Sequence, residues 1–190
     1  KIPVLNLRLY SVYGPYEDSS KLIPILCKEV LRKKLPPFAN QTTSRDFIYI
    51  DDVVDAFVTA SLKIHPDIFG ESINIGSGRE ITLLELARIT KDLFKIKEEP
   101  KFSSSIARHW DTDNWYANTS KAKELLDWEQ TTTFEEGLTN TFKWWKNINK
   151  NLNFDTLTKK EGVLKKNSIT AIIACYKDEL AIPIMYEKLV

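Results

Sequence analysis

The stretch Ser44-Arg45-Asp46-Phe47-Ile48-Tyr49-Ile50-Asp51-Asp52 brings together a predicted strand, a predicted helix start and a candidate anion ligand. Its residues 47–50 are aromatic or β-branched, which favours a buried strand. The two aspartates at its end are suited to cap a helix that begins at Val53. Arg45 precedes the strand and carries a planar guanidinium that matches phosphate oxygens, but pairing with Asp46 or another surface carboxylate explains it as well. The stretch alone leaves both roles of Arg45 open.

Helices and strands follow one another singly on both sides of this stretch. Before it, residues 4–10 predict a strand, and apolar residues at helical spacing predict a helix from Leu22 that is stopped by Leu35-Pro36-Pro37-Phe38. After it, the sequence predicts a helix over 53–62 with Leu62 on its apolar face, a strand over 72–75 and a turn over 76–78. Three further helices are predicted to begin at Thr82, about Ser120 and Thr133, the first and last with capping boxes. This alternation predicts an α/β fold, whose strand order the sequence does not reveal.

The composition is that of a globular chain without an excess of charge. Of 190 residues, 43% are hydrophobic, which is enough for a core, and 27 basic residues stand against 26 acidic ones. So small a net charge gives no field to gather nucleic acid, and we expect no nucleic-acid partner. No apolar run reaches the roughly 20 residues of a membrane span, so no transmembrane segment is predicted.

The cysteines and histidines give no metal-site pattern. Cys27 and Cys175 lie far apart, and His65 and His109 stand alone, so we expect no bound metal. The low cysteine content fits a reducing, cytoplasmic location. The chain opens on Lys1 and its only methionine is Met185, from which we expect a segment of a longer protein.

The composition changes after the last of these helices. Residues 147–167 are rich in Asn, Lys and Thr and predict an interdomain linker after a domain over 1–146. Residues 169–174 are a continuous apolar run typical of a buried parallel strand, and a helix is predicted from about Pro183. Residues 168–190 therefore predict the first β-α unit of a second domain.

The turn Gly76-Ser77-Gly78 lies between a predicted strand and a predicted helix, as dinucleotide-binding loops do. The third glycine of that motif is missing, because Ile81 stands near its place. A structural turn before the helix capped by Thr82 is the simpler interpretation.

Several segments, in order, resemble the C-terminal half of extended short-chain dehydrogenases, the nucleotide-sugar epimerase and dehydratase family. The resemblance covers most of residues 1–146 and rests on Leu7 to Pro15, Lys21 to Pro24, Leu35 to Phe38, Ser44 to Asp52, Ser72 to Gly78, Arg108 to Asp111 and Thr119 to Trp128. It implies a partial Rossmann-like fold, made of the last strands and the substrate-binding subdomain.

The resemblance also implies roles for single residues toward a nucleoside-diphosphate sugar. Arg45 and Arg108 would grip the two phosphates, Asn74 would bond the ribose or base, and Ser11 would face the sugar. Lys21 and Leu22 belong to the segment that clasps the nucleotide, and Phe38 to the loop around base and ribose. Leu9 and Tyr10 would offer backbone to the nicotinamide of NAD or NADP. The family more often has Asn at the place of Ser11, and Ala39-Asn40-Gln41 replaces a glycine-flanked turn.

The family's cofactor loop and its catalytic Tyr-x-x-x-Lys precede the portion matched here. None of the seven tyrosines has a lysine four residues later. We therefore expect no catalysis by this segment alone and expect NAD or NADP to be bound mainly by the missing N-terminal half. A non-catalytic nucleotide-sugar-binding or scaffold module is the alternative. A homodimer is a candidate assembly.

Residues 168–190 resemble the opening of inverting, dolichyl-phosphate-mannose-synthase-like glycosyltransferases. Tyr176, Asp178 and Glu179 match that family's nucleotide site, while Lys177 replaces its usual Asn. The resemblance implies an epimerase or dehydratase fused to a glycosyltransferase, a pairing suited to surface-glycan synthesis.

Overall fold

A computed structural model describes residues 3–103 and 116–151. Its elements in chain order are β1 (Asn6–Leu9), β2 (Ser11–Tyr13), α1 (Leu22–Leu31), β3 (Ser44–Arg45), β4 (Phe47–Tyr49), α2 (Ile50–Lys63), the 3-10 turn η1 (Pro66–Ile68), β5 (Ser72–Ile75), β6 (Ile81–Thr82), α3 (Leu83–Phe94), α4 (Ser120–Leu126) and α5 (Phe134–Asn151). The fold is α/β, as the sequence predicts. Of the described helices, none combines the length and the hydropathy that crossing a bilayer requires.

The strands pair two by two. β1 runs parallel to β5, β2 runs parallel to β4, and β3 pairs antiparallel with β6. The chain changes partner at Tyr10, whose N–H donates to the Ile75 carbonyl at 3.0 Å, while the next N–H, that of Ser11, donates to the Asp46 carbonyl at 2.9 Å. The strand predicted over residues 4–10 is thus present as β1, and a second short strand that was not predicted, β2, follows it, because the backbone bonds first to β5 and then to the start of β4.

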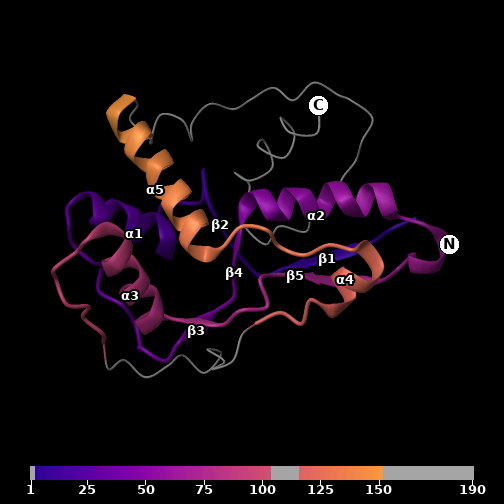
Figure 1. Ribbon diagram of the computed structural model, residues 1–190, viewed down its shortest axis with the longest axis horizontal. Coiled ribbons are helices and arrows are strands. Elements are labelled where there is room, and N and C mark those ends of the chain that lie inside the picture. The colour runs from indigo at the N-terminus through magenta and orange to yellow at the C-terminus, as the bar shows by residue number, and fades with distance from the viewer. Residues whose placement is uncertain (1–2, 104–115, 152–190) are drawn as a thin grey trace.

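Two hydrophobic clusters form the core of the described residues. One gathers α1, α3 and α5 around the aromatic side chains of β2 and β4, with Trp145 and Tyr13 almost fully buried. The other packs α2 and α4 against β1 and β5 around Ile73 and Ile75. Figure 1 shows α1, α3 and α5 on the left and α2 and α4 with β1 and β5 on the right, and β4 runs between the two groups. The ends of the strands thus lie at the junction of two separately packed halves.

The end of the opening stretch differs from its prediction. α2 begins at Ile50 rather than Val53, so β4 ends at Tyr49, and the residue at the cap, Tyr49, makes no side-chain cap bond. The two aspartates lie inside the first turn, where they still face the positive end of the helix dipole. Asp52 does not cap its own helix because it accepts hydrogen bonds from the loop before α5 instead.

The other predicted elements that the structure describes include one helix, one strand and two capping boxes. The strand over 72–75 is confirmed. The helix predicted from Leu22 is present but ends at Leu31 rather than directly before Leu35, because Lys33 has a left-handed backbone conformation that a helix does not continue. Thr82 accepts from the Glu85 N–H, but the Glu85 carboxylate pairs with Arg79, so only half of that capping box forms. Thr133 and Glu136 form both halves of theirs.

Two predictions about helix surfaces and ends need correction. Leu62 is 80% exposed and does not lie on the buried face, because it lies about 200° around the helix from the buried Ala60. α5 continues to Asn151, and residues 147–151, predicted as the start of the linker, are helical. The rest of the predicted linker and residues 168–190 lie outside the described residues.

Candidate functional site

The candidate site lies where β1 and β5 end. These strands are parallel, with Leu9 opposite Ile75, so their carboxyl ends meet at one edge, which is where open α/β sheets bind ligands. Tyr10 and Ser11 follow β1 directly, and Gly76 follows β5. Ser11 and Phe47 then stand side by side in the β2–β4 pair. The backbone therefore brings Leu9, Tyr10 and Ser11 to the strand edge.

Arg45 reaches the same junction from β3. It pairs with Ile81 across the antiparallel β3–β6 ladder, and its guanidinium Nη1 donates to the Ser44 carbonyl at 2.7 Å. The side chain of Ser44 is in turn bonded to Glu80 at 2.5 Å. Arg45 is half-buried.

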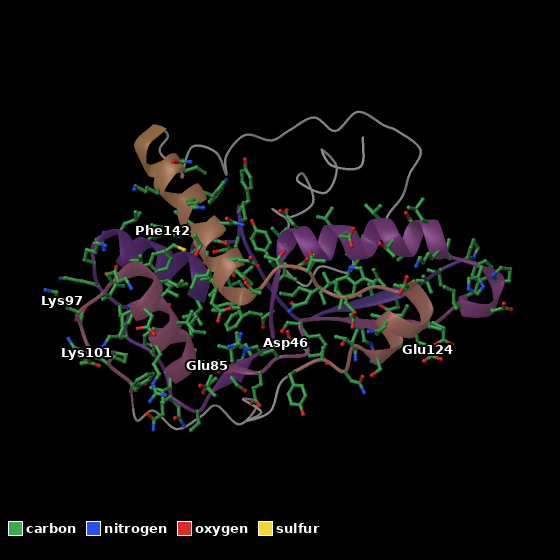
Figure 2. All side chains as sticks on the ribbon, in the orientation of Figure 1. Asp46, Glu85, Lys97, Lys101, Glu124 and Phe142 are labelled. Atoms are coloured by element: carbon green, nitrogen blue, oxygen red, sulfur yellow. The ribbon has the colours of Figure 1, made fainter. Side chains whose placement is uncertain are left out.

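Asp46 connects three segments of the junction. Its side chain is fully buried, with 0% exposure, and its Oδ1 accepts from the Ser77 N–H at 2.7 Å and the Ser77 hydroxyl at 2.6 Å. Its Oδ2 accepts from the N–H groups of Gly78 at 3.0 Å and Ala117 at 2.8 Å. Figure 2 shows Asp46 between the two halves of the molecule, near the ends of the strands. A single carboxylate thus fixes the turn after β5 and the segment before α4.

Asn74 lies in β5, close in sequence to Ser77, one of the residues that Asp46 binds. It is opposite Arg8 in the β1–β5 register, is partly exposed, and its Nδ2 donates to the Asn118 carbonyl at 3.3 Å. Asn118 follows Ala117, the residue that Asp46 holds. The structure therefore brings Ser11, Arg45 and Asn74 into one network of neighbouring backbone segments.

Three other predicted residues lie on α1 and its following loop. Lys21 is exposed at the N-terminal cap of α1, and Leu22 is partly buried against the α1, α3 and α5 cluster. Phe38 is only 3% exposed and stacks on Phe102 with ring centroids 5.6 Å apart. Its N–H and carbonyl bond to the backbone of Lys101 and Ser103. In the described chain Phe38 is thus a core residue. Its ring is buried, while the neighbouring loop residues Pro37 and Ala39 are exposed to solvent.

The remaining predicted residues fall outside the described ranges. These are Arg108 in the first resemblance and Tyr176, Asp178 and Glu179 in the second. Among residues 3–103 and 116–151, no group of three or more His, Cys, Asp and Glu is placed to hold a metal ion. His65 is half-exposed and 3.4 Å from Asp67.

The titratable groups with the largest shifts lie in the core beneath α1, α2 and α5. Burial raises the pKa of the Cys27 thiol to about 12. Burial, with the negative charges of Asp51 and Asp52, raises the pKa of Tyr49 to about 12, and burial first of all raises the pKa of Tyr13 as well. The Tyr13 hydroxyl donates to the Phe134 carbonyl at 3.2 Å. These groups stay protonated near neutral pH and serve packing.

The sequence analysis missed the roles of Asp46 and Gly76. A Cβ on Gly76 would lie 2.6 Å from the Ala117 Cβ and 2.8 Å from the Asp46 Oδ2, so only glycine admits this close approach. An aspartate directly before four apolar residues is the available signal, because a charged side chain at the start of a buried strand needs a set of donors. The positions of those donors, 31 and 71 residues further along the chain, have no local signal.

Comparison with protein families finds a match along most of the chain. The model of the GDP-mannose 4,6 dehydratase family matches residues 1–141. The chain belongs to this family. The match stops before residues 168–190, which the sequence analysis likens to a glycosyltransferase.

Curated relatives extend the same result. An uncharacterized UDP-glucose epimerase of Bacillus subtilis is 36% identical over 140 residues, which are 73% of this chain and 43% of that protein. The dTDP-D-glucose 4,6-dehydratase of Homo sapiens is 30% identical over 167 residues, covering 80% of this chain and 46% of the relative. The chain is therefore homologous to nucleotide-sugar epimerases and dehydratases, and it spans less than half the length of these two relatives.

Solved structures share the fold. The UDP-glucose 4-epimerase of Thermotoga maritima with UDP-glucose has a TM-score of 0.66 and 30% identity over 75% of this chain and 46% of its own. The UDP-glucuronic acid 4-epimerase of Bacillus cereus in complex with UDP-glucuronic acid and NAD has a TM-score of 0.67 and 28% identity over 77% of this chain and 46% of its own. The described residues thus have the α/β fold of Rossmann-like epimerases and dehydratases, a family with an NAD-type cofactor.

Proposed function

We propose that residues 1–146 are the nucleotide-sugar-binding half of an NAD(P)-dependent nucleotide-sugar epimerase or dehydratase. The observation that carries the proposal is the junction that holds Ser11, Arg45 and Asn74 at the carboxyl ends of two parallel strands. The similar solved structures are complexes with UDP-glucose or with UDP-glucuronic acid and NAD, which supports this ligand class.

In this proposal Arg45 binds the diphosphate. A guanidinium donates charge-assisted hydrogen bonds to phosphate oxygens in a fixed fork, and the bond from its Nη1 to the Ser44 carbonyl holds the fork in one orientation. Arg108 is proposed to bind the same diphosphate from the opposite side.

The remaining proposed contacts surround the nucleoside and the sugar. Asn74 bonds the ribose or the base, and Ser11 faces the sugar. Leu22 and the loop of Phe38 pack against the nucleotide, with Lys21 at the neighbouring start of α1. Together these residues give a site for both ends of the substrate.

The cofactor would meet this half only at its nicotinamide end. NAD supplies a hydride acceptor when bound, and backbone at Leu9 and Tyr10 would orient the carboxamide. The Tyr10 N–H donates to Ile75 and its carbonyl accepts from Val12, so the carboxamide would meet a carbonyl that can accept a second hydrogen bond. The proton transfer that accompanies hydride loss needs a Tyr-x-x-x-Lys pair, which these 190 residues do not contain.

The test is a titration of UDP-glucose, UDP-glucuronic acid and dTDP-glucose into the full natural polypeptide with NAD bound. Arg45→Ala should weaken binding of the preferred ligand about 10- to 100-fold, because it removes charge-assisted bonds to phosphate. Arg45→Lys should recover only part of the affinity, since it keeps the charge but loses the fork. Arg32→Ala, which removes an exposed arginine paired with Glu29, is the matched control and should leave the affinity unchanged. Absence of binding, or equal affinity for Arg45→Ala, contradicts the proposal.

A non-catalytic nucleotide-sugar-binding module is the second candidate. It is favoured by the absence of Tyr-x-x-x-Lys from these residues. A full natural polypeptide that binds a nucleotide sugar but neither reduces NAD nor changes the sugar, as followed by absorbance and by chromatography of the product, would decide for this module.

The finer proposal concerns the surroundings of this half. We infer a linker up to about residue 167 and a glycosyltransferase domain from 168, with Tyr176, Asp178 and Glu179 at its nucleotide site, in cytoplasmic synthesis of surface polysaccharide. A homodimer is the proposed assembly, which sedimentation at several concentrations would test. Glycosyl transfer from a nucleotide sugar by the full polypeptide, lost in Asp178→Asn, would support the fusion, and its absence would contradict it.

A further inference from the structure

We propose that Asp46 is a positioning residue for nucleotide-sugar binding, which acts by holding Asn74 and Arg45 in place from beneath the site. This inference rests on the proposed function and adds a residue that none of the roles above includes. Asp46 cannot touch the ligand, because its side chain is fully buried. Its effect must therefore pass through the residues that it binds.

The hydrogen bonds of Asp46 use both oxygens of its carboxylate. Three N–H groups and one hydroxyl donate to its two oxygens, two to each, at 2.6 to 3.0 Å. A carboxylate offers about four acceptor positions and no donor, so the four donors match its whole capacity. Gly76 passes so close that even a methyl group would meet Oδ2. The site around this carboxylate is therefore built for one side chain.

The first connection runs from Asp46 to Asn74. Asp46 Oδ2 holds the Ala117 N–H, and the carbonyl of the next residue, Asn118, accepts from Asn74 Nδ2 at 3.3 Å. On the other side, Asp46 Oδ1 holds Ser77 in the turn that directly follows β5. Asn74 is thus connected to Asp46 by two routes, at its amide through Asn118 and Ala117, and along its strand through Ser77.

The second connection runs through the backbone. Asp46 follows Arg45, and the Asp46 carbonyl accepts from the Ser11 N–H at 2.9 Å. The guanidinium of Arg45 is bonded to the carbonyl of Ser44, on the same two-residue strand. A displacement of Asp46 would therefore move the proposed diphosphate ligand and the proposed sugar contact together.

Asp52 provides a matched comparison for a purely structural role. It is 4% exposed and accepts from the N–H and hydroxyl of Thr131 and from the N–H of Thr132. These residues lead into α5, and none of them adjoins a proposed ligand contact. Replacement of Asp52 by Asn should destabilise the fold by a similar mechanism without changing the ligand site.

The test is a double-mutant cycle in the full natural polypeptide with NAD, with UDP-glucose as the first probe and UDP-glucuronic acid and dTDP-glucose tried if it does not bind. Asp46→Asn keeps the size of the side chain but places an amide N–H against N–H groups that now donate to the carboxylate. Asn74→Ala removes the proposed ribose or base contact. We expect each to raise the Kd about tenfold, as the loss of one good hydrogen bond does. Because one of the two connections of Asp46 runs through Asn74, the double variant should lie within about twofold to threefold of the weaker-binding single variant rather than near the hundredfold product, and the remainder is the share that runs through Arg45.

The control and the second variant make each outcome decisive. Asp52→Asn should leave the Kd unchanged and combine with Asn74→Ala by simple multiplication. If Asp46→Asn does not fold, Ser77→Ala takes its place in the cycle and should raise the Kd about threefold, again without adding to Asn74→Ala. If the effects of Asp46→Asn and Asn74→Ala on the Kd multiply, or if Asp46→Asn binds as tightly as Asp52→Asn, the role of Asp46 is overturned and the proposed function is not. Absence of binding by the unaltered protein to all three sugars overturns the proposed function and this inference with it.

Discussion

Asp46 and Asp52 come from the same short stretch of sequence and solve the same physical problem in two regions of the molecule. Each is a buried carboxylate that accepts hydrogen bonds from a loop far along the chain, Asp46 from Ser77, Gly78 and Ala117, and Asp52 from Thr131 and Thr132. Burial of an unpaired charge is costly, so both need these donors to be stable. What differs is where the donors lie, since only those of Asp46 adjoin proposed ligand contacts.

The comparison shows that the chemistry of a buried carboxylate does not by itself indicate a functional role. Asp52 joins α2, most of whose buried residues lie in one hydrophobic cluster, to the loop before α5, which packs in the other. Asp46 joins β3 and β4 to the turn after β5 and to the segment before α4. Both carboxylates therefore connect the two clusters, but only the donors of Asp46 lie at the strand ends that carry the proposed ligand contacts.

The largest expected effect is the loss of either carboxylate. Asp46→Ala should lower the free energy of unfolding by about 4 kcal/mol, because four donors lose their acceptor and the Ala117 N–H is buried. Asp52→Ala should cost about 2 kcal/mol, because Thr131 is exposed and water can replace the lost acceptor. Urea denaturation of both variants measures the difference. An equal or larger loss for Asp52→Ala would remove the distinction between the two regions.

A methyl group at a close approach should give the next largest effect. Gly76→Ala places a Cβ 2.6 Å from the Ala117 Cβ beside Asp46, and it should cost about 3 kcal/mol and weaken nucleotide-sugar binding. Gly137→Ala in α5 places a Cβ 2.2 Å from the Tyr13 hydroxyl oxygen, but alanine's better helix propensity offsets about 1 kcal/mol, so we expect a net loss of about 1 to 2 kcal/mol.

Unfolding and binding measurements on these two glycine variants form a pair. Weaker binding by Gly137→Ala would show that the α5 region also controls the site. Unchanged binding by Gly76→Ala would show that the junction tolerates displacement, against the role proposed for Asp46.

A single hydroxyl on each side should give a smaller effect. Ser77→Ala removes the 2.6 Å bond to Asp46 and should cost about 1.5 kcal/mol, since hydrogen bonds to charged groups are the stronger ones. Thr131→Val removes the 2.9 Å bond to Asp52 with little change of shape and should cost about 0.5 kcal/mol, because Thr131 is exposed. Thermal unfolding of both variants measures the order, and a larger loss for Thr131→Val would contradict it.

The sequence predicted the elements of both regions better than their connections. Local patterns are enough for the helix that begins at Leu22, the strand over 72–75 and the capping box of Thr133, because spacing and caps are properties of adjacent residues. The partner change at Tyr10 was not predicted, because it depends on β4 and β5. Asp52 was predicted as a helix cap for the same reason, since its actual partners lie 79 and 80 residues away.

The candidate site was predicted as a set of residues, not as a network. The ordered motifs indicate Ser11, Arg45 and Asn74, and the structure brings the segments that carry them together. Their roles toward a ligand stay predictions. Phe38 shows a limit of such patterns, because an aromatic residue in a loop can bind a ligand or fill the core, and its burial against Phe102 depends on a distant segment. Asp46 lies within the Ser44 to Asp52 motif, but the resemblance gives it no role toward a ligand, and its partners are known only from the fold.

The smallest expected effect separates the two carboxylates by charge alone. The pKa of Tyr49 is raised from 10.0 to about 12 by burial and then by Asp51 and Asp52. Because the folded pKa lies above the unfolded one, this stabilisation is complete below pH 10 and is lost as the pH rises from 10 to about 12. Asp52→Asn removes one of the negative charges, so it should lower the pKa of Tyr49 and make the alkaline loss of stability shallower, whereas Asp46→Asn should leave its slope unchanged. Urea midpoints across this pH range, with Tyr49→Phe to identify the share of Tyr49, measure the slopes. Equal slopes for the two Asn variants would mean that the two regions do not differ in their electrostatic coupling to the core.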